Sequence, residues 1–257
     1  MRPRFRLRGK QGHVRSLAEF VDVASRVTSV WCRHVEFIPW FRGQHRASRP
    51  LLPSLYRDEN RRVKEFDCRF DFKYRGLPLL DGAAREPKSE WDWYFLMQHH
   101  GVPTRLLDWS ESALVALYFA VADSSEREDA AVWMLDPWAI NVRIANIGKR
   151  IFGGEDPELQ PYLPSVYGSK LPDPPVALQA PYASRRIAAQ KSCFTLHGSD
   201  RTPLNKYPQL ASRLYQIVIA KGAIRRIQRA LELSGVTQST VFPDLSNLAA
   251  ELLRYWR

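Results

Sequence analysis

Apolar residues recur at helical spacing after residues that can cap a helix. Ser16 precedes such a run, and Glu19 stands three residues later, which is the pattern of a capping box. We therefore predict a helix over residues 16–28. Ser89 precedes a second, aromatic-rich run that stops at Gly101. Glycine suits the position just after a helix, so a helix is expected from residue 90 to about residue 100.

Similar patterns predict the remaining helices. Ser110 is expected to cap a short helix that reaches residue 121, with Glu111 in its first turn. Residues 58–72 and 223–233 are also expected to be helical. Leucines near the end of the chain predict a final amphipathic helix over residues 245–256.

Continuous apolar runs predict buried strands over residues 130–135, 192–197 and 214–220. A further strand is expected to end at Arg42, with Gly43 opening a turn. Strands and helices follow one another without regular βαβ alternation, which favours an α+β fold. The first residues lack any periodicity. We therefore expect a flexible basic arm over residues 1–15 and a single domain over residues 16–257.

Composition indicates an ordinary globular protein. The chain has 257 residues, of which 45% are hydrophobic and 25% charged, and this is enough to bury a core. No apolar run approaches the roughly 20 residues of a membrane span, so no membrane association is expected. The basic start leads into no apolar stretch, so no secretory signal is expected. The cysteines, three in number, form no CxxC motif and predict neither disulfides nor zinc. A cytoplasmic location fits these features.

The charge of the chain favours anionic partners. The formal net charge is +11, with concentrations of Lys and Arg in residues 2–10, 57–75 and 221–229. Nucleic acid, nucleotides and acidic proteins are the partners that such a field attracts. An ordinary charged surface explains the same residues equally well, because charge alone does not identify a nucleic-acid site.

Several common site motifs are missing from the sequence. We find no P-loop, no dinucleotide fingerprint and no GxSxG elbow. His99 and His100 are adjacent and would face different directions on a helix, so they do not form a metal-binding pair. Asp108 and Glu111 are the only closely spaced carboxylates near them. We therefore expect no metal.

Two stretches are unusually polar for their apolar surroundings. The first is Trp-Phe-Arg-Gly-Gln at residues 40–44, in which Arg42 at a strand end suits bidentate binding of phosphate or carboxylate. An ion pair with a carboxylate elsewhere in the fold is the alternative role for Arg42. The second is residues 98–109, which combine amide, imidazole, hydroxyl, guanidinium, carboxylate and indole groups. A buried polar network that specifies the core is the alternative for this stretch.

These stretches resemble the FRG domain family, which is named for its Phe-Arg-Gly triplet. The resemblance covers residues 16–253 and is strongest in residues 40–44, 53–57, 98–109 and 116–120. Arg186, Gln190, Phe194 and the string Val-Phe-Pro-Asp-Leu at residues 241–245 also agree with it. The resemblance implies a bacterial protein.

The order of the same pieces is similar to ADP-ribosyltransferases of the Arg-Ser-Glu type. This more distant resemblance implies a split β-sheet core with surrounding helices, and NAD as substrate without a metal. Arg42 and Gly43 match the element that holds the NAD phosphates, and residues 103–105 with 116–120 match the strand and helix that line the nicotinamide ribose. Two features depart from that pattern: Thr104 alone remains of three hydroxyl residues, and Gln190 stands where the catalytic Glu is expected.

The resemblance implies a role for each candidate residue. Arg42 would clamp the pyrophosphate, Thr104 and His99 would hold the nicotinamide ribose, and Trp109 or Tyr118 would stack on the nicotinamide. Gln190, with help from Asp108, would orient the reacting ribose, although an amide supplies no negative charge. The expected catalytic residues are Arg42, His99, Thr104, Asp108 and Gln190. The expected NAD-binding residues are Arg42, Gly43, Gln44, His99, Thr104, Arg105, Trp109 and Tyr118.

Three functions remain open at this point. The first is transfer of ADP-ribose from NAD to a nucleic acid, RNA rather than DNA, with hydrolysis of NAD as a close variant. By resemblance, such an enzyme would be a toxin or phage-defence effector that an antitoxin or other inhibitory partner restrains. The second is a nucleotide- or RNA-binding module without chemistry, which Gln190 favours. The third is a metal-independent ribonuclease with His99 or His100 as acid and base, and with Arg42 and Arg105 on the phosphate.

Overall fold

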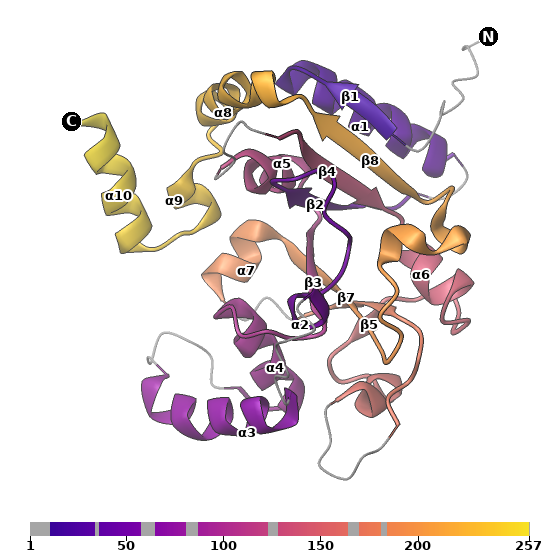
Figure 1. Cartoon of the computed structure of the whole chain (residues 1–257). Coiled ribbons are helices and arrows are strands. Elements are labelled where there is room, and N and C mark those ends of the chain that lie inside the picture. The colour runs from indigo at the N-terminus through magenta and orange to yellow at the C-terminus, as the bar shows by residue number, and fades with distance from the viewer. Residues whose placement is uncertain are drawn as a thin grey trace.

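The computed structural model of the protein describes residues 11–33, 36–57, 65–80, 87–122, 128–163, 170–180 and 184–256. These residues form one eight-stranded sheet in the order β1-β8-β4-β2-β3-β7-β6-β5 (Figure 1). The strands along that order are Gln11–Val14, Leu214–Ile219, Ala130–Leu135, Trp40–Gln44, Leu106–Ser110, Ser192–Leu196, Val176–Gln179 and Phe152–Gly153. Pairing is parallel at the two outer pairs, β1–β8 and β5–β6, and antiparallel elsewhere. The expected mixture of helices and strands is confirmed, and the sheet is mixed with mostly antiparallel pairs.

The shortest strand pairing in the sheet lies at its centre, between β2 and β3. β2 pairs with β4 along its whole length, and β3 does the same with β7. Between β2 and β3, however, the ladder consists of the single register pair Phe41↔Ser110. The two strands therefore diverge from this point and divide the sheet into two halves.

Helices cover both halves (Figure 1). α1 (Leu17–Trp31), α5 (Ala113–Val121) and α8 (Ile224–Leu233) pack on the half that contains β1, β8, β4 and β2. α4 (Glu90–His99) packs on the other half, and α3 (Glu65–Gly76) lies against α4. The shorter helices and the last helix are α2 (Ser54–Arg57), α6 (Pro137–Arg143), α7 (Arg185–Gln190), α9 (Gln238–Val241) and α10 (Leu245–Tyr255).

The hydrophobic core is continuous on one face of the sheet and divided on the other. One cluster, which includes Trp40, Leu107 and Trp133, draws residues from both halves. On the opposite face, one cluster surrounds α5 and α8, and a separate cluster surrounds α4. The space between these two clusters is where the cavity described below lies.

Local sequence signals account for several helix ends. The Ser16 hydroxyl accepts the Glu19 N–H at 3.2 Å, and the Glu19 carboxylate accepts the N–H of Arg15, one residue before the cap. Ser89 and Asp92 form a complete capping box at the start of α4. Gly101 follows α4 with a φ of +76°, a left-handed conformation that glycine adopts without strain.

Some expected boundaries were wrong. Residues 11–14 belong to β1, which pairs with β8, and are not part of a flexible arm; residues 1–10 lie outside the described residues. Gly43 continues β2 to Gln44 and opens no turn. Ser110 ends β3, and Ser112 is the residue that caps α5, by accepting the N–H of Val115 at 3.4 Å.

One further expected helix is shifted along the chain. The helix expected over residues 58–72 is α3, which begins at Glu65, while residues 58–64 lie outside the described residues. A 3-10 turn at Leu77–Leu79 follows α3, and residues 81–86 again lie outside the described part. The final helix is α10, but its leucines are exposed rather than buried, with Leu245 82% accessible. Among the described helices, none has the length and apolar character needed to cross a membrane.

Candidate functional site

A cavity of about 620 Å³ opens where β2 and β3 diverge. Phe41 and Ala116 border it from the core cluster around α5, and Phe95 and Phe194 border it from the cluster around α4. Polar residues from β2, β3, α4 and α7 complete the wall. Apolar walls with a few convergent polar groups are typical of small-molecule sites, and the volume lies in the usual range of roughly 300–1,000 Å³.

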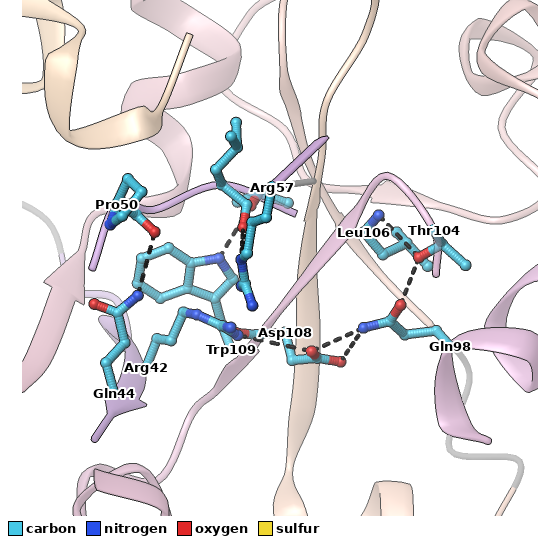
Figure 2. A network of polar contacts seen from close by, with 11 residues as sticks. Arg42, Gln44, Pro50, Arg57, Gln98, Thr104, Leu106, Asp108 and Trp109 are labelled. Carbon is cyan, nitrogen blue, oxygen red and sulfur yellow. Dashed lines mark hydrogen bonds and ion pairs between the residues drawn. The ribbon is translucent and has the colours of Figure 1, made fainter. Parts of the chain in front are cut away.

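Arg42 lies at the junction of the two half-sheets. Its Nη1 donates a hydrogen bond to the backbone carbonyl of Asp108 at 2.5 Å and lies 3.7 Å from the Asp108 carboxylate (Figure 2). Its Nε is buried and has no hydrogen-bond partner among the described residues. Burial lowers the pKa of Arg42, and the nearby Asp108 carboxylate partly offsets that effect. The guanidinium therefore still has an unused donor in a place of restricted solvent access.

A chain of hydrogen bonds holds the Asp108 carboxylate in place (Figure 2). Gln98 on α4 donates from Nε2 to both carboxylate oxygens, at 2.9 and 2.8 Å. The Thr104 hydroxyl donates to Oε1 of Gln98 and accepts the N–H of Leu106 at 3.1 Å. Because Thr104 engages the amide oxygen, the amide nitrogen of Gln98 must face Asp108. The carboxylate, which is 54% exposed, is thus oriented while it remains accessible.

Two further arginines lie near Arg42, on the loop and the short helix that follow β2. Arg49 lines the cavity, and Arg57 donates from Nε to the carbonyl of Leu52 at 2.7 Å. Burial lowers the pKa of Arg57 to about 10, and the positive charges of Arg42 and Arg49 lower it further. The negative charge of Asp108 raises the pKa of Arg57 and partly offsets these effects. The described residues at this end of the cavity thus carry a net positive charge.

His99 and Arg186 also border the cavity. Burial lowers the pKa of His99 to about 4, and the charges of Arg186 and His100 act in the same direction. His99 is therefore uncharged at neutral pH and offers one ring nitrogen as a donor and the other as an acceptor. The guanidinium of Arg186 stacks on Phe242 at 4.7 Å from the ring centroid, which positions it on the wall.

Gln190, Ser110 and Ser192 form another part of the cavity wall. Gln190 donates from Nε2 to the carbonyl of Val241 at 3.2 Å, and its own backbone carbonyl accepts from the Ser110 hydroxyl at 2.6 Å. Ser110 and Ser192 are register partners in β3 and β7. Because this bond uses one of its two amide N–H groups, Gln190 can offer its side-chain oxygen as an acceptor and its second N–H as a donor to a ligand.

Three expected site residues have clear packing roles in the wall. A Cβ at Gly43 would lie 2.0 Å from the carbonyl oxygen of Ala116, so glycine is needed here for α5 to approach β2. Gln44 is buried and accepts the indole N–H of Trp133 at 2.9 Å. The Trp109 ring is also buried, and its N–H donates to Thr195 at 3.0 Å.

Three other expected residues do not line the cavity. Thr104 is fully buried behind Gln98 and has no access to a ribose. Arg105 is 1% exposed, and its guanidinium binds Glu65 and the carbonyls of His197 and Tyr162. These two residues form the buried polar network that was the alternative interpretation of this stretch. Tyr118 lies on the other side of α5, beside Phe242 and a separate pocket.

The structure thus brings together Arg42, His99, Asp108 and Gln190 from four separate elements. It adds Arg49, Ser110, Arg186 and Ser192, which sequence reasoning did not place in the site. Arg186 is among the residues that resemble the FRG family, and Ser110 directly follows the similar stretch over residues 98–109. The resemblance could therefore have pointed to both residues. Arg49 lies outside those strings. Within the described residues, no group of three or more His, Cys, Asp or Glu side chains could hold a metal ion.

No curated protein and no solved structure matches this chain. One family model does match, and it covers β2, α4, β3 and α5, which supply most of the cavity wall. The remainder of the wall comes from α7 and β7, which lie beyond the matched segment. Residues 38–129 of this protein match the FRG domain family.

Proposed function

We propose that the cavity binds NAD and that the protein transfers ADP-ribose from NAD to a nucleic acid acceptor. The observation that carries this proposal is the state of Arg42. The Arg42 side chain is largely buried, its buried Nε has no partner among the described residues, and two further arginines lie nearby. The guanidinium therefore loses solvation without gaining full charge compensation. A phosphate group supplies the missing negative charge and accepts bidentate hydrogen bonds from arginine.

The rest of the cavity suits the other parts of a dinucleotide. Neutral His99 can both donate to and accept from ribose hydroxyls, and Gln190 can accept from one. Phe41, Phe95 and Phe194 offer apolar surface to the planar rings. Asp108 supplies the one carboxylate among the described lining residues. We therefore assign to Asp108, rather than Gln190, the negative charge that stabilises a positively charged ribose in the transition state.

The reaction exchanges one bond for another at the nicotinamide ribose. The C1′–nitrogen bond breaks, and nicotinamide leaves with the bonding electron pair. A hydroxyl oxygen or ring nitrogen of the acceptor forms the new bond to C1′ and releases its proton to water. In this scheme Arg42 holds the pyrophosphate, Asp108 faces the developing charge, and His99 with Gln190 orients the ribose.

The test is incubation of the protein with adenine-labelled NAD and total cellular RNA, DNA or protein. Label on RNA or DNA, with nicotinamide released in equal amount, is the expected result. Arg42→Ala should abolish NAD binding and label transfer, whereas Arg26→Ala, which changes an exposed arginine of α1 paired with Asp22, should retain both. Full NAD-dependent activity in Arg42→Ala would contradict the proposal. RNA cleavage that needs no NAD would instead favour a ribonuclease.

A second function has specific support from the same cavity. No carboxylate stands at Gln190, and both oxygens of Asp108 are already hydrogen-bonded by Gln98. These features favour a site that binds a nucleotide without chemistry. Gln190→Glu distinguishes the two functions, because an added charge near the ribose should raise the rate of nicotinamide release by about tenfold if transfer occurs. A pure binding module would gain no activity from it.

A further inference from the structure

The loop from His45 to Pro53, between β2 and α2, is fixed by bonds from several distant parts of the chain. Ala47 donates its N–H to the Asp129 carbonyl at 2.8 Å, and its own carbonyl accepts from Gln216 at 2.7 Å. Leu51 is fully buried, and its carbonyl accepts the N–H of Leu204 at 3.0 Å. The loop is therefore held in one conformation without a ligand, and the side chains on it are presented in advance.

This loop presents Arg49 to solvent at the edge of the cavity, and α2 presents Arg57 beside it. Among the described residues, no hydrogen bond or ion pair engages the Arg49 guanidinium. Arg57 uses its Nε on Leu52, which orients its guanidinium and leaves the terminal nitrogens for another partner. We call Arg49 and Arg57 the arginine edge.

The arginine edge differs from the other basic positions nearby. Arg46 lies on the same loop, but it is paired with Glu128 at 3.6 Å. On α3, Arg69 and Lys73 both pair with Glu90, and Arg75 pairs with Asp71 at 3.3 Å. The basic stretch over residues 57–75 is therefore largely neutralised in its described part. Unlike these positions, Arg49 and Arg57 have no ion pair among the described residues, and they lie close enough to Arg42 for their charges to interact.

We propose that the arginine edge binds the phosphates of a single nucleic acid strand, the acceptor, one nucleotide of which enters the cavity beside Asp108. This inference rests on the transfer activity proposed above and names where its acceptor docks. Two exposed guanidiniums beside a third suit a ligand with repeated phosphates, because each can bind one phosphate. The acceptor is a single strand because a nucleotide paired and stacked in a duplex cannot reach an atom inside a cavity.

The position of the edge distinguishes it from the other basic surface of the protein. Arg225 and Arg229 are exposed on α8, within the basic stretch over residues 221–229. α8 packs against α1 and α5 and contributes no described residue to the cavity wall. A strand bound there would not be directed towards Asp108. α8 therefore serves as the control surface.

The test measures binding of a fluorescent uridine oligomer of about 12 nucleotides, and of the matching DNA strand, as a function of salt. Arg49→Ala/Arg57→Ala should weaken binding by roughly tenfold or more and reduce the salt slope by about 0.7 for each phosphate that the variant no longer binds. Two controls should bind like the wild type: Arg46→Ala on the same loop, and Arg225→Ala/Arg229→Ala on α8. Stronger binding of one strand type identifies the acceptor as RNA or DNA.

Three results would overturn the inference: no strand binding by the wild type, an equal loss of affinity in either control, or label transfer to protein instead of nucleic acid. NAD binding, measured by calorimetry on the same variants, separates this inference from the proposed function. Arg42→Ala should lose NAD binding, whereas Arg49→Ala/Arg57→Ala, which removes neighbouring positive charges but not the guanidinium assigned to the pyrophosphate, should weaken NAD binding less than it weakens strand binding. Strand binding that depends on the edge, without any NAD binding, would remove the proposed function but keep the edge as a nucleic acid site.

Discussion

Arg42 on β2 and Asp108 on β3 face each other where these two strands share a single register pair. The arginine donates to the backbone carbonyl of Asp108 at 2.5 Å, while its distance to the carboxylate is 3.7 Å. The short hydrogen bond therefore does not use the side chain of Asp108. Gln98 holds that side chain from the other side. The junction and the carboxylate can consequently be changed separately by mutation.

Asp108→Asn should preserve the fold and NAD binding but lower the rate of nicotinamide release by roughly a hundredfold. The backbone carbonyl that binds Arg42 is unchanged, whereas the charge assigned to the transition state is removed. Steady-state kinetics with NAD measures the effect, which should be on kcat rather than KM. A variant that binds NAD poorly but turns it over at the normal rate would show that Asp108 has no such role.

Thr104→Val should reduce activity although Thr104 cannot reach the ligand. The variant removes the hydroxyl that orients Gln98 and leaves the Leu106 N–H without its acceptor, at a cost of about 1–3 kcal/mol in stability. Thr104→Ser retains the hydroxyl and should restore both activity and stability. Denaturant unfolding and nicotinamide release, measured on both variants, test this prediction. An equal loss of activity in Thr104→Val and Thr104→Ser would show that the Thr104 hydroxyl does not orient Gln98.

Gly43→Ala should destabilise the protein by about 1–3 kcal/mol or more, because the added Cβ would lie 2.0 Å from the Ala116 carbonyl and 2.5 Å from the Ala120 nitrogen. Both neighbours are backbone atoms of α5, so relief requires the helix to move. Gly222→Ala is the matched control, since its Cβ would meet nothing within 4 Å. Urea unfolding should separate the two, and equal stability would mean that α5 shifts freely.

Arg105→Met should destabilise the protein by about 3–5 kcal/mol, because it removes the ion-pair partner of Glu65 in a largely buried position. It also removes the donors to the carbonyls of His197 and Tyr162. If this variant does not fold, Arg105→Lys should fold with lower stability, since one ammonium cannot serve three acceptors at once. Arg75→Ala, which alters an exposed ion pair of α3, should change stability by less than about 0.5 kcal/mol.

Stability should fall as the pH decreases from about 6.5 towards 4. Burial lowers the pKa of His197 from 6.5 to about 4, with partial compensation from Thr202 and Asp200. In this window the unfolded chain binds a proton that the folded protein does not, so acid favours unfolding, by on the order of 3 kcal/mol for a fully buried group. Half-buried His99 acts in the same direction with a smaller effect. Urea unfolding of His197→Gln should show a shallower pH dependence than the wild type, and an unchanged slope would contradict this assignment.

Local signals in the sequence predicted those elements whose ends are fixed by neighbouring residues. The Ser89–Asp92 capping box and Gly101 define α4 without help from the rest of the fold. β1 could not be predicted in this way, because its stability comes from pairing with β8, some 200 residues later in the chain. Ser110 and Ser112 are equally good caps by sequence. The pairing of Ser110 with Ser192 assigns it to a strand and leaves the cap to Ser112.

The candidate site was likewise predicted only where the local sequence carries the information. Arg42 and Asp108 were predicted because polar groups in apolar surroundings are visible in the sequence. The sequence does not reveal which polar groups turn inward, so Thr104 and Arg105 were assigned to a ligand although they belong to the core. Arg49 was not predicted, since its importance comes from the distant residues that hold its loop.

The junction between β2 and β3 also has a practical consequence for identifying the ligand. One backbone pair and the Arg42 side chain join the half-sheets there. A molecule that contacts both Arg42 and α7 would connect the two halves of the sheet. Ligand binding would increase the free energy of unfolding, and the melting temperature would rise with ligand concentration. Thermal shift against a panel of phosphorylated metabolites would therefore find the natural ligand without an assay for its chemistry.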